Sequence, residues 1–501
     1  MKPASQDEEY ILEDQKSAMK MSSKEEQDVQ QTAVYVSTPP KSRLARLLMN
    51  WKFLAILGAI IIILVILIPV LLLVDLRRRH EHSVAGPSNA NEAARYSVLQ
   101  HNFPDPTVIE VDDTFYGFAT RNPANLSLHI QVAQSKPGNI ASWELLAGFD
   151  ALPTLPAWVT NHTDAAVWAP QVQQRDDGSF IMTYAALSQE HPRKHCLGLA
   201  TSTSVTGPYI PTSDEPFLCH WSLGGIIDPG FLIDPVSNTS YIYYKNDGNA
   251  IGSGGACANG NWPNTPTTFQ YDVMNSNLTA LEVSPFTPYH NATQAINTTD
   301  NATIFMHNTR IDGSNIESPF VLYREYQHPN TSEVKRAYHL LYNSGCFTDS
   351  SYRIQHIPCW LEGNVTHFTD CPWQELKDTQ ARTILGSATY PQPNGAESAL
   401  LWAPGGPAVT QDGQYMVFHA DIVSHWEDPA MKRGKHEGEG HEHRKRDNGT
   451  SIVNLGPPGN PSKKRVRALF VAEMDYEYDW TARSNNVQRG LKVQRLVLPE
   501  S

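Results

Sequence analysis

The chain has 501 residues, of which 40% are hydrophobic and 18% are charged, and its formal net charge is −13. This length is too great for one ordinary compact domain unless that domain is a large all-β one. The negative charge argues against nucleic acid as a partner, because phosphate binding requires a basic face, and it is compatible with a neutral polymer such as a polysaccharide.

The N-terminal part of the chain predicts a tail, one transmembrane helix and a stalk. Residues 1–50 are polar and acidic and bury too little apolar surface to fold, so we expect a disordered tail. Residues 51–76 contain the uncharged apolar segment 53–74, which as a helix spans the roughly 30 Å hydrocarbon core. A buried core helix or a cleaved signal peptide has a shorter apolar run. Residues 77–98 are expected to form a short stalk.

The orientation of this helix follows from what lies after it. Basic residues flank the apolar segment on both sides in similar number, so the positive-inside rule does not decide. Glycosylation acceptors of the type Asn-x-Ser/Thr are dense after the segment, at Asn125, Asn161, Asn238, Asn277, Asn291, Asn297, Asn301, Asn330, Asn364 and Asn448. We therefore expect a single-pass type II membrane glycoprotein of the secretory pathway, with residues 1–50 in the cytosol and the rest lumenal or extracellular.

All six cysteines also follow the membrane segment: Cys196, Cys219, Cys257, Cys346, Cys359 and Cys371. An even count in an oxidising compartment indicates disulfides, of which fifteen full pairings can be drawn. We expect Cys196 to pair with Cys219. We also expect two of the last three cysteines to pair with each other. Free buried thiols in a cytosolic domain are the alternative.

A loose internal repeat runs through residues 99–501. Each unit has a proline, a short apolar strand, a polar turn and an aromatic-rich strand, as in 105–118, 169–184, 228–244, 318–342 and 406–418. Each unit predicts a hairpin with its proline at the start of the first strand. The spacing fits one four-stranded blade per unit and therefore a five-bladed β-propeller, an all-β fold; a β-sandwich is the alternative, but would not repeat this plan five times.

One stretch interrupts the last unit. Residues 426–466 are rich in Lys, Arg, His, Glu, Gly and Pro, so we expect a disordered surface insertion. Its histidines (His436, His441 and His443) are metal-ligand candidates, although a solvated charged loop explains them as well. The basic run 444–446 is a candidate processing site.

Three of the repeat units carry an acidic residue at the start of the first strand. Asp105 and Asp228 directly precede the proline, and Glu317 lies two residues before it. The innermost strands of a propeller run in the same direction around one axis, so these three carboxyl groups should meet at one mouth. Hydrolysis of a glycosidic bond requires a pair of carboxyl groups, and clustered carboxylates raise one another's pKa. The alternative is that these acids only cap turns.

Four segments resemble the signature segments of glycoside hydrolase family 43: 103–108 (FPDPTV), 167–170 (VWAP), 227–231 (IDPGF) and 316–320 (IESPF). The resemblance covers about residues 99–425 and 467–480, and it rests on the order and spacing of the four segments together, since each segment alone is a weak signal. It implies a five-bladed propeller that hydrolyses arabinose- or xylose-containing glycans with inversion of configuration, and it implies no cofactor for the chemistry.

The resemblance also implies roles for individual residues. Asp105 corresponds to the general base, Glu317 to the general acid, and Asp228 to the residue that tunes the pKa of the acid and orients the substrate. His419 in the segment FHAD resembles the family histidine near the central axis, beside which a hydrated structural Ca²⁺ is often bound; a hydrogen-bonded strand-end histidine is the alternative.

Two tryptophans and one substitution complete the candidate site. Trp168 and Trp402 each open a Trp-Ala-Pro segment and are expected either to stack on a sugar or to pack in the core. Gln171 stands where the family has Asp, which puts one secondary polar contact in doubt.

Three other functions remain open. The invertase-like retaining enzymes share the propeller but fit these motifs less well. The membrane anchor is also found among secretory-pathway enzymes that trim or transfer glycans. A non-catalytic glycan-binding propeller has no need of the three acids.

Overall fold

The computed structural model of the protein describes residues 94–122, 125–160, 165–282, 303–307, 315–373, 381–391, 398–423, 465–477 and 490–499. The chain divides into two compact units, Met1–His82 and Ser83–Ser501, and every described residue lies in the second. Within these ranges no helix is long and apolar enough to cross a membrane. The predicted tail, the predicted transmembrane helix and the predicted insertion up to residue 464 lie outside the described residues, whereas residues 465–466 already belong to a strand.

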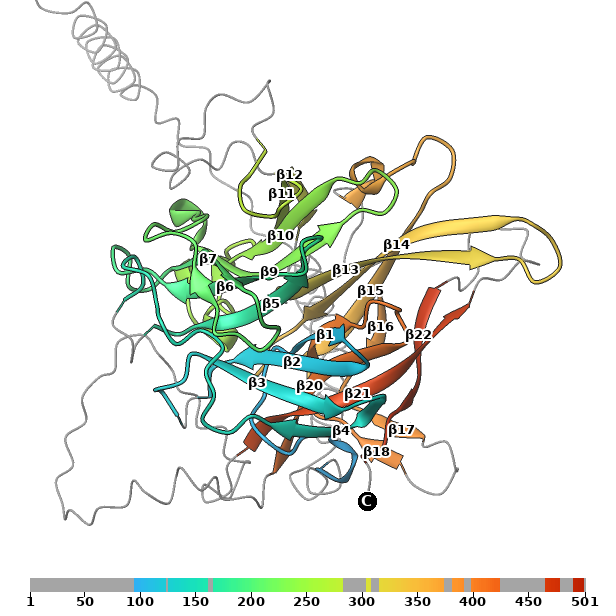
Figure 1. The fold of residues 1–501 in the computed structure, drawn as a ribbon, viewed down its shortest axis with the longest axis horizontal. Helices are drawn as coiled ribbons and strands as arrows, with labels where there is room; N and C mark the ends of the chain where they lie inside the picture. Colours follow the sequence, from blue (N-terminus) through green and yellow to red (C-terminus); the bar gives the residue numbers. More distant parts are fainter. Residues whose placement is uncertain are drawn as a thin grey trace, which may run out of the picture. The chain divides into compact units, whose positions relative to one another are not determined.

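The described part of the second unit is an all-β propeller of five four-stranded sheets, as the repeat predicted (Figure 1). In each sheet the strands follow one another in chain order and pair antiparallel. Blade 1 consists of β1 (Thr107–Val111), β2 (Thr114–Thr120), β3 (Ile130–Lys136) and β4 (Asn139–Leu145). Blade 2 consists of β5 (Trp168–Gln174), β6 (Phe180–Leu187), β7 (His195–Ser202) and β8 (Ile210–Pro211).

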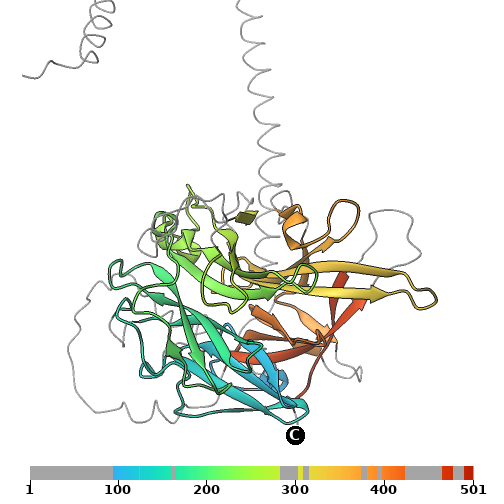
Figure 2. The same ribbon diagram turned by 45° about the horizontal axis from the view of Figure 1, so that its top comes forward.

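The other three blades have the same plan, and Figure 2 shows the sheets succeeding one another in chain order from blue to red. Blade 3 consists of β9 (Ile226–Ile233), β10 (Ser240–Asn246), β11 (Thr268–Met274) and β12 (Thr303–His307). Blade 4 consists of β13 (Ile316–Gln327), β14 (Val334–Ser344), β15 (Arg353–Trp360) and β16 (Arg382–Leu385). Blade 5 consists of β19 (Gly405–Val409), β20 (Tyr415–Val423), β21 (Arg465–Glu477) and β22 (Gly490–Leu496).

Short elements lie between these strands. The hairpin of β17 (Thr389–Pro391) and β18 (Ser398–Leu400) connects blade 4 to blade 5. The described 3₁₀ turns are η1 (Ala94–Tyr96), η2 (Trp221–Leu223), η3 (Gly248–Ile251), η4 (Ala256–Ala258) and η5 (Phe368–Asp370).

The first strand of every blade belongs to a closed inner ring. β1 contacts β5, β5 contacts β9, β9 contacts β13, β13 contacts β19, and β19 contacts β1 again. The segment before β1 reinforces the closure, because Leu99 pairs with Leu469 on β21 and the Phe103 N–H donates to the Arg467 carbonyl at 2.8 Å. The first blade is thus joined to the last, and radial closure leaves few sheet edges exposed.

The local sequence explains these hairpins. The turn between β1 and β2 is formed by Asp112 and Asp113, whose φ angles of 50° and 60° suit the two-residue turn that matches the twist of paired strands. Gly178 and Gly413 supply the positive φ in the corresponding turns of blades 2 and 5.

The hydrophobic core lies between neighbouring blades. The second strands are sandwiched on both faces, and every residue of β6 and β10 is buried. Strands buried on both faces have nearly continuous apolar or aromatic sequences, as FIMTYAAL in β6 shows. In β10 the same pattern contains one cation, Lys245, which is fully buried.

The six cysteines form three disulfides. Cys196 pairs with Cys219, as predicted, and Cys359 pairs with Cys371, which confirms that two of the last three cysteines pair with each other. The third disulfide joins Cys257 in η4 to Cys346 after β14.

Candidate active site

The residue before the proline has a left-handed conformation in all five inner strands. Its φ is 52° at Asp105, 43° at Ala169, 52° at Asp228, 50° at Ser318 and 62° at Gly406. In the last four the ladder with the second strand shifts register at this point, which marks a bulge. A bulge redirects side chains at the rim of a sheet. The repeated conformation thus gives the equivalent residues of five blades equivalent positions around one mouth of the propeller.

Asp228 lies at the centre of the acidic cluster. Its Oδ2 accepts a hydrogen bond of 2.8 Å from the Ser318 N–H, so it lies against the residue that follows Glu317. Burial raises the pKa of Asp228 from 3.8 to about 7, against the lowering effect of Lys245, and the charges of Glu317 and Asp105 add to the rise. The three predicted acids are therefore brought together.

Glu317 is held by two donors from blade 3. Its Oε1 accepts hydrogen bonds from the Lys245 ammonium at 3.0 Å and from the Asn249 side-chain amide at 3.2 Å. Lys245 also lies 3.8 Å from Asp247. One oxygen of Glu317 is thus anchored, while Oε2 makes no hydrogen bond to the described residues.

Asp105 is held by blades 1 and 5. Its Oδ2 accepts a 2.7 Å hydrogen bond from the Thr120 hydroxyl, which in turn accepts the Ala169 N–H at 2.9 Å. Its Oδ1 lies 3.6 Å from the Arg467 guanidinium. The backbone must also come close here, because a Cβ on Gly406 would lie 2.8 Å from the Asp105 Cα.

Tyr352 is a further member of the cluster. It is buried, and burial together with the charges of Glu317, Asp105 and Asp228 raises its pKa well above the usual value. Its ring stacks on His419 with 6.2 Å between centroids. The phenol thus lies within electrostatic reach of all three acids, and it is neutral at physiological pH.

His419 lies beside Asp105, and the protonation of its ring decides whether it could bind the predicted calcium directly. Nδ1 accepts the Asp105 N–H at 3.0 Å, while burial and Arg467 hold the pKa of His419 well below its usual range, so Nε2 carries the proton. Nε2 is buried and without a hydrogen-bond partner among the described residues. A protonated nitrogen does not ligate a metal, but it can donate to water.

The neutral ring of His419, with Nδ1 occupied and Nε2 protonated, therefore does not fit a direct bond to a metal. It does fit a hydrogen bond from Nε2 to an ordered water molecule. No group of three or more potential metal-binding side chains occurs in the described part of the chain. The calcium itself stays a prediction, and nothing in the chemistry below depends on it.

The two candidate tryptophans differ in their surroundings. Trp168 is partly exposed, and its ring stacks on the buried His195 at 3.9 Å between centroids. Trp402 is also partly exposed, and its carbonyl accepts the Asp421 N–H at 2.9 Å. Gln171, which stands where the family has Asp, accepts a hydrogen bond from the Phe231 N–H through its side chain. This bond links β5 to β9, so the glutamine has a structural role.

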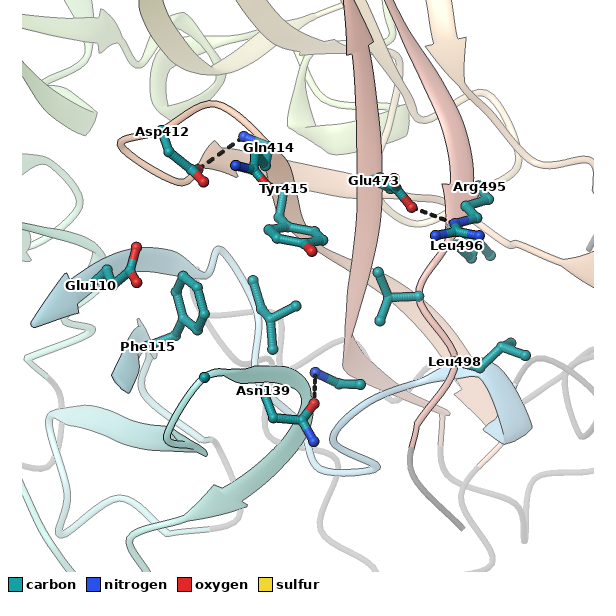
Figure 3. Close-up of a pocket in the computed structure, with 14 residues that line it drawn as sticks. Glu110, Phe115, Asn139, Asp412, Gln414, Tyr415, Glu473, Arg495, Leu496 and Leu498 are labelled. Atoms are coloured by element: carbon teal, nitrogen blue, oxygen red, sulfur yellow. Dashed lines mark hydrogen bonds and ion pairs between the residues drawn. The ribbon is translucent and has the colours of Figure 1, made fainter. Parts of the chain in front are cut away.

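A cavity of about 510 Å³ lies elsewhere, between blades 1 and 5 (Figure 3). Glu110, Phe115, Asp412 and Tyr415 line it, at the ends of the hairpins opposite to Asp105. The cavity is therefore separate from the acidic cluster.

Sequence reasoning missed Lys245, Asn249, Thr120, Tyr352 and Arg467. One signal was present, because Lys245 ends a run of aromatic and aliphatic residues that is typical of a buried strand. A lysine there requires an acidic partner. The other four residues carry no such signal: Asn249 and Tyr352 lie outside the strands, and Thr120 and Arg467 lie near strand ends.

Comparison with known proteins bears on the first half of the propeller. Residues 94–262 match the sequence model of glycosyl hydrolases family 43. The matched segment contains Asp105 and Asp228 and ends before Glu317, so the similarity covers blades 1 and 2 and the beginning of blade 3.

Curated relatives match over a similar part of the chain. An extracellular endo-α-(1→5)-L-arabinanase of Thermotoga petrophila is 33% identical over 167 residues, which cover 28% of this chain and 33% of the relative. A probable arabinan endo-1,5-α-L-arabinosidase D of Emericella nidulans is 27% identical over 150 residues, which cover 28% of this chain and 36% of the relative. The match thus spans about a third of the length of each relative.

Among solved structures, a thermostable family-43 glycoside hydrolase is similar with a TM-score of 0.48 and 19% identity, over 80% of this chain and 96% of that one.

The raised pKa of Asp228 predicts a pH-dependent stability. Because the folded pKa of about 7 exceeds the ordinary 3.8, folding takes up a proton between about pH 4 and pH 7, and stability falls as the pH rises through this window. Asp228→Asn should therefore be more stable than the unmodified protein at pH 8, by at most about 4 kcal/mol, and the difference should vanish near pH 4. Denaturant titrations at several pH values measure this.

Asp150 provides a control of opposite sign. Hydrogen bonds from the His129 side chain and from backbone N–H groups lower its pKa despite burial. Asp150→Asn should therefore be less stable than the unmodified protein at neutral pH, with a difference that shrinks as the pH falls through the lowered pKa. A pH-independent effect of Asp228→Asn would contradict the assignment.

Proposed function

We propose that the protein is a glycoside hydrolase that cleaves arabinose- or xylose-containing glycans with inversion of configuration. The observation that carries this proposal is the convergence of Asp105, Asp228 and Glu317 from three blades, with Lys245 and Asn249 fixing one oxygen of Glu317. The family match of residues 94–262 supports the same reaction class.

A general acid must carry a proton near neutral pH. The cluster has more acidic groups than cations, which favours a bound proton. Lys245 is surrounded by Glu317, Asp247 and Asp228, and burial raises the pKa of both aspartates. Coupled carboxyl groups share their protons as a set. Asp228 therefore holds a proton near pH 7 in the same cluster as Glu317.

The contacts of each acid support a division of roles. Glu317 donates a proton to the leaving oxygen through Oε2, because Oε1 is engaged by Lys245 and Asn249. Asp105, held by Thr120, takes a proton from the attacking water on the opposite face of the sugar. Asp228 acts through the shared proton and the Ser318 backbone.

Two further points support the choice of substrate. The two curated relatives are named as an arabinanase and an arabinosidase, which favours arabinose-containing glycans. The net charge of −13 suits a neutral polysaccharide better than an anionic polymer. The reaction needs no cofactor, because the two carboxyl groups supply the acid and the base.

The test is hydrolysis by the full chain of a panel of aryl-glycosides and of linear arabino- and xylo-oligosaccharides. We expect release of a pentose from at least one of them, and NMR should show the inverted anomer first. Initial retention would favour the invertase-like mechanism. Binding without turnover would favour a glycan-binding protein.

We further propose that the propeller lies on the lumenal or outer side of a secretory membrane, anchored through residues 53–74. Four described acceptor asparagines, Asn238, Asn277, Asn330 and Asn364, are exposed, so they are accessible to glycosylation. Treatment of the cell-made protein with an N-glycosidase should lower its apparent mass by several glycans, and residues 1–50 should be cleaved by protease only from the cytosolic side. An unshifted band would contradict this orientation.

A further inference from the structure

The loop between β10 and β11 presents an unusual surface. It carries two exposed large apolar side chains, Ile251 with 41% and Trp262 with 79% of its surface accessible. Single exposed apolar residues are common, but a tryptophan is seldom left this open unless a ligand or partner covers it.

This loop also contacts the candidate acid. Asn249, near its start, donates to Glu317 at 3.2 Å, and the Asn259 side-chain amide donates to the Asn249 oxygen at 3.1 Å. Trp262 follows Asn259 by three residues, so the two Cα atoms are at most roughly 11 Å apart. The loop that carries Trp262 is therefore the same loop that holds Glu317, while none of the described contacts joins the indole to the acids themselves.

The loop is fastened at several points, so the backbone on both sides of Trp262 has a defined position. The Cys257–Cys346 disulfide ties it to the segment after β14. The Ser253 hydroxyl lies 2.6 Å from the Asn261 carbonyl and 2.7 Å from that of Pro263, on both sides of Trp262. Because the backbone is already fixed, only the side chain of Trp262 has to be ordered when a ligand covers it.

We propose that Trp262 is a stacking platform for a sugar of the glycan chain beyond the one whose bond is cleaved. The C–H face of a sugar ring is apolar and packs on an aromatic face, while its hydroxyl groups stay in water. A side chain on the loop that holds the acid, but outside the contacts of the acid itself, would engage a longer chain and leave a single terminal sugar untouched. This inference rests on the proposed function, since it extends the binding site of the same cluster.

The test compares Trp262→Ala with the unmodified full chain on two substrates. With the arabino- or xylo-oligosaccharide that the protein cleaves, KM should rise about threefold to tenfold and kcat should stay within about twofold. With the corresponding aryl-glycoside, both constants should be unchanged. Trp262→Phe should recover most of the loss, because it restores an aromatic face.

Ile210→Ala is the matched control, because Ile210 is 57% exposed on β8 of another blade. This variant should leave KM and kcat unchanged on both substrates. An unchanged KM for the oligosaccharide in Trp262→Ala, or equal effects on both substrates, would overturn the inference.

A second measurement separates this inference from the proposed function. Binding of the oligosaccharides to Glu317→Gln and to the same variant with Trp262→Ala can be followed by calorimetry. If the unmodified protein hydrolyses nothing, the proposed function fails, while weaker binding after loss of Trp262 still supports the platform. Hydrolysis of aryl-glycosides without any binding of oligosaccharides would overturn the platform alone. Absence of both hydrolysis and oligosaccharide binding would overturn the platform and the proposed function together.

Discussion

Asp105→Asn should reduce hydrolysis about 10²- to 10⁴-fold on activated and natural substrates alike, because it removes the group that activates water. Activation of the attacking water is required whatever the leaving group is. The asparagine has nearly the same shape and can still accept the Thr120 hydroxyl. Glycan binding should therefore persist, which calorimetry can measure beside the initial rates.

Asp112→Asn is the matched control for this substitution. Asp112 is exposed in the turn of the same hairpin, at the end opposite to Asp105, and asparagine tolerates its φ of 50°. Its activity should equal that of the unmodified protein. Turnover that survives Asp105→Asn unchanged would place the general base elsewhere.

Glu317→Gln should produce an effect that depends on the leaving group. A natural glycan has a poor leaving oxygen that needs protonation, so its turnover should fall about 10²- to 10⁴-fold. An activated aryl-glycoside, whose leaving oxygen is a weaker base, should lose much less. Rates plotted against the pKa of the leaving phenol should show a steep slope in the variant and a shallow one in the unmodified protein.

Glu325→Gln is the control on the same strand. Glu325 is exposed near the far end of β13, where it bonds to Tyr323 and Arg336. It should leave the leaving-group dependence unchanged. Equal losses on all substrates after Glu317→Gln would argue against its role as the proton donor.

The repeat and its hairpins could be predicted from the sequence because they depend on neighbours along the chain. The residue before each proline has a left-handed φ, and the turn at Asp112 has the expected conformation. The positions of Asp105 and Asp228 in this repeat were enough to predict their convergence with Glu317, because equivalent residues of a closed ring face one axis. The expected Cys196–Cys219 pair joins residues only 23 positions apart.

Long-range pairings could not be predicted in this way. Lys245 reaches Glu317, 72 residues further along the chain, only because β10 packs beside β13. Arg467 reaches Asp105 from the opposite end of the propeller domain because blade 5 closes on blade 1. Cys257 and Cys346 are separated by 89 residues.

The sequence by itself therefore determined the all-β repeat, the inner strands and the three acids, since proline, turn residues and strand patterns act locally. Only the tertiary structure decided which cation and which amide hold Glu317, that Asp228 has a pKa of about 7, and that the nitrogen of His419 facing away from Asp105 is protonated. The physical reason is that burial and charge pairing are properties of the packing between blades, and no local pattern in the chain encodes which residues of two different blades will meet.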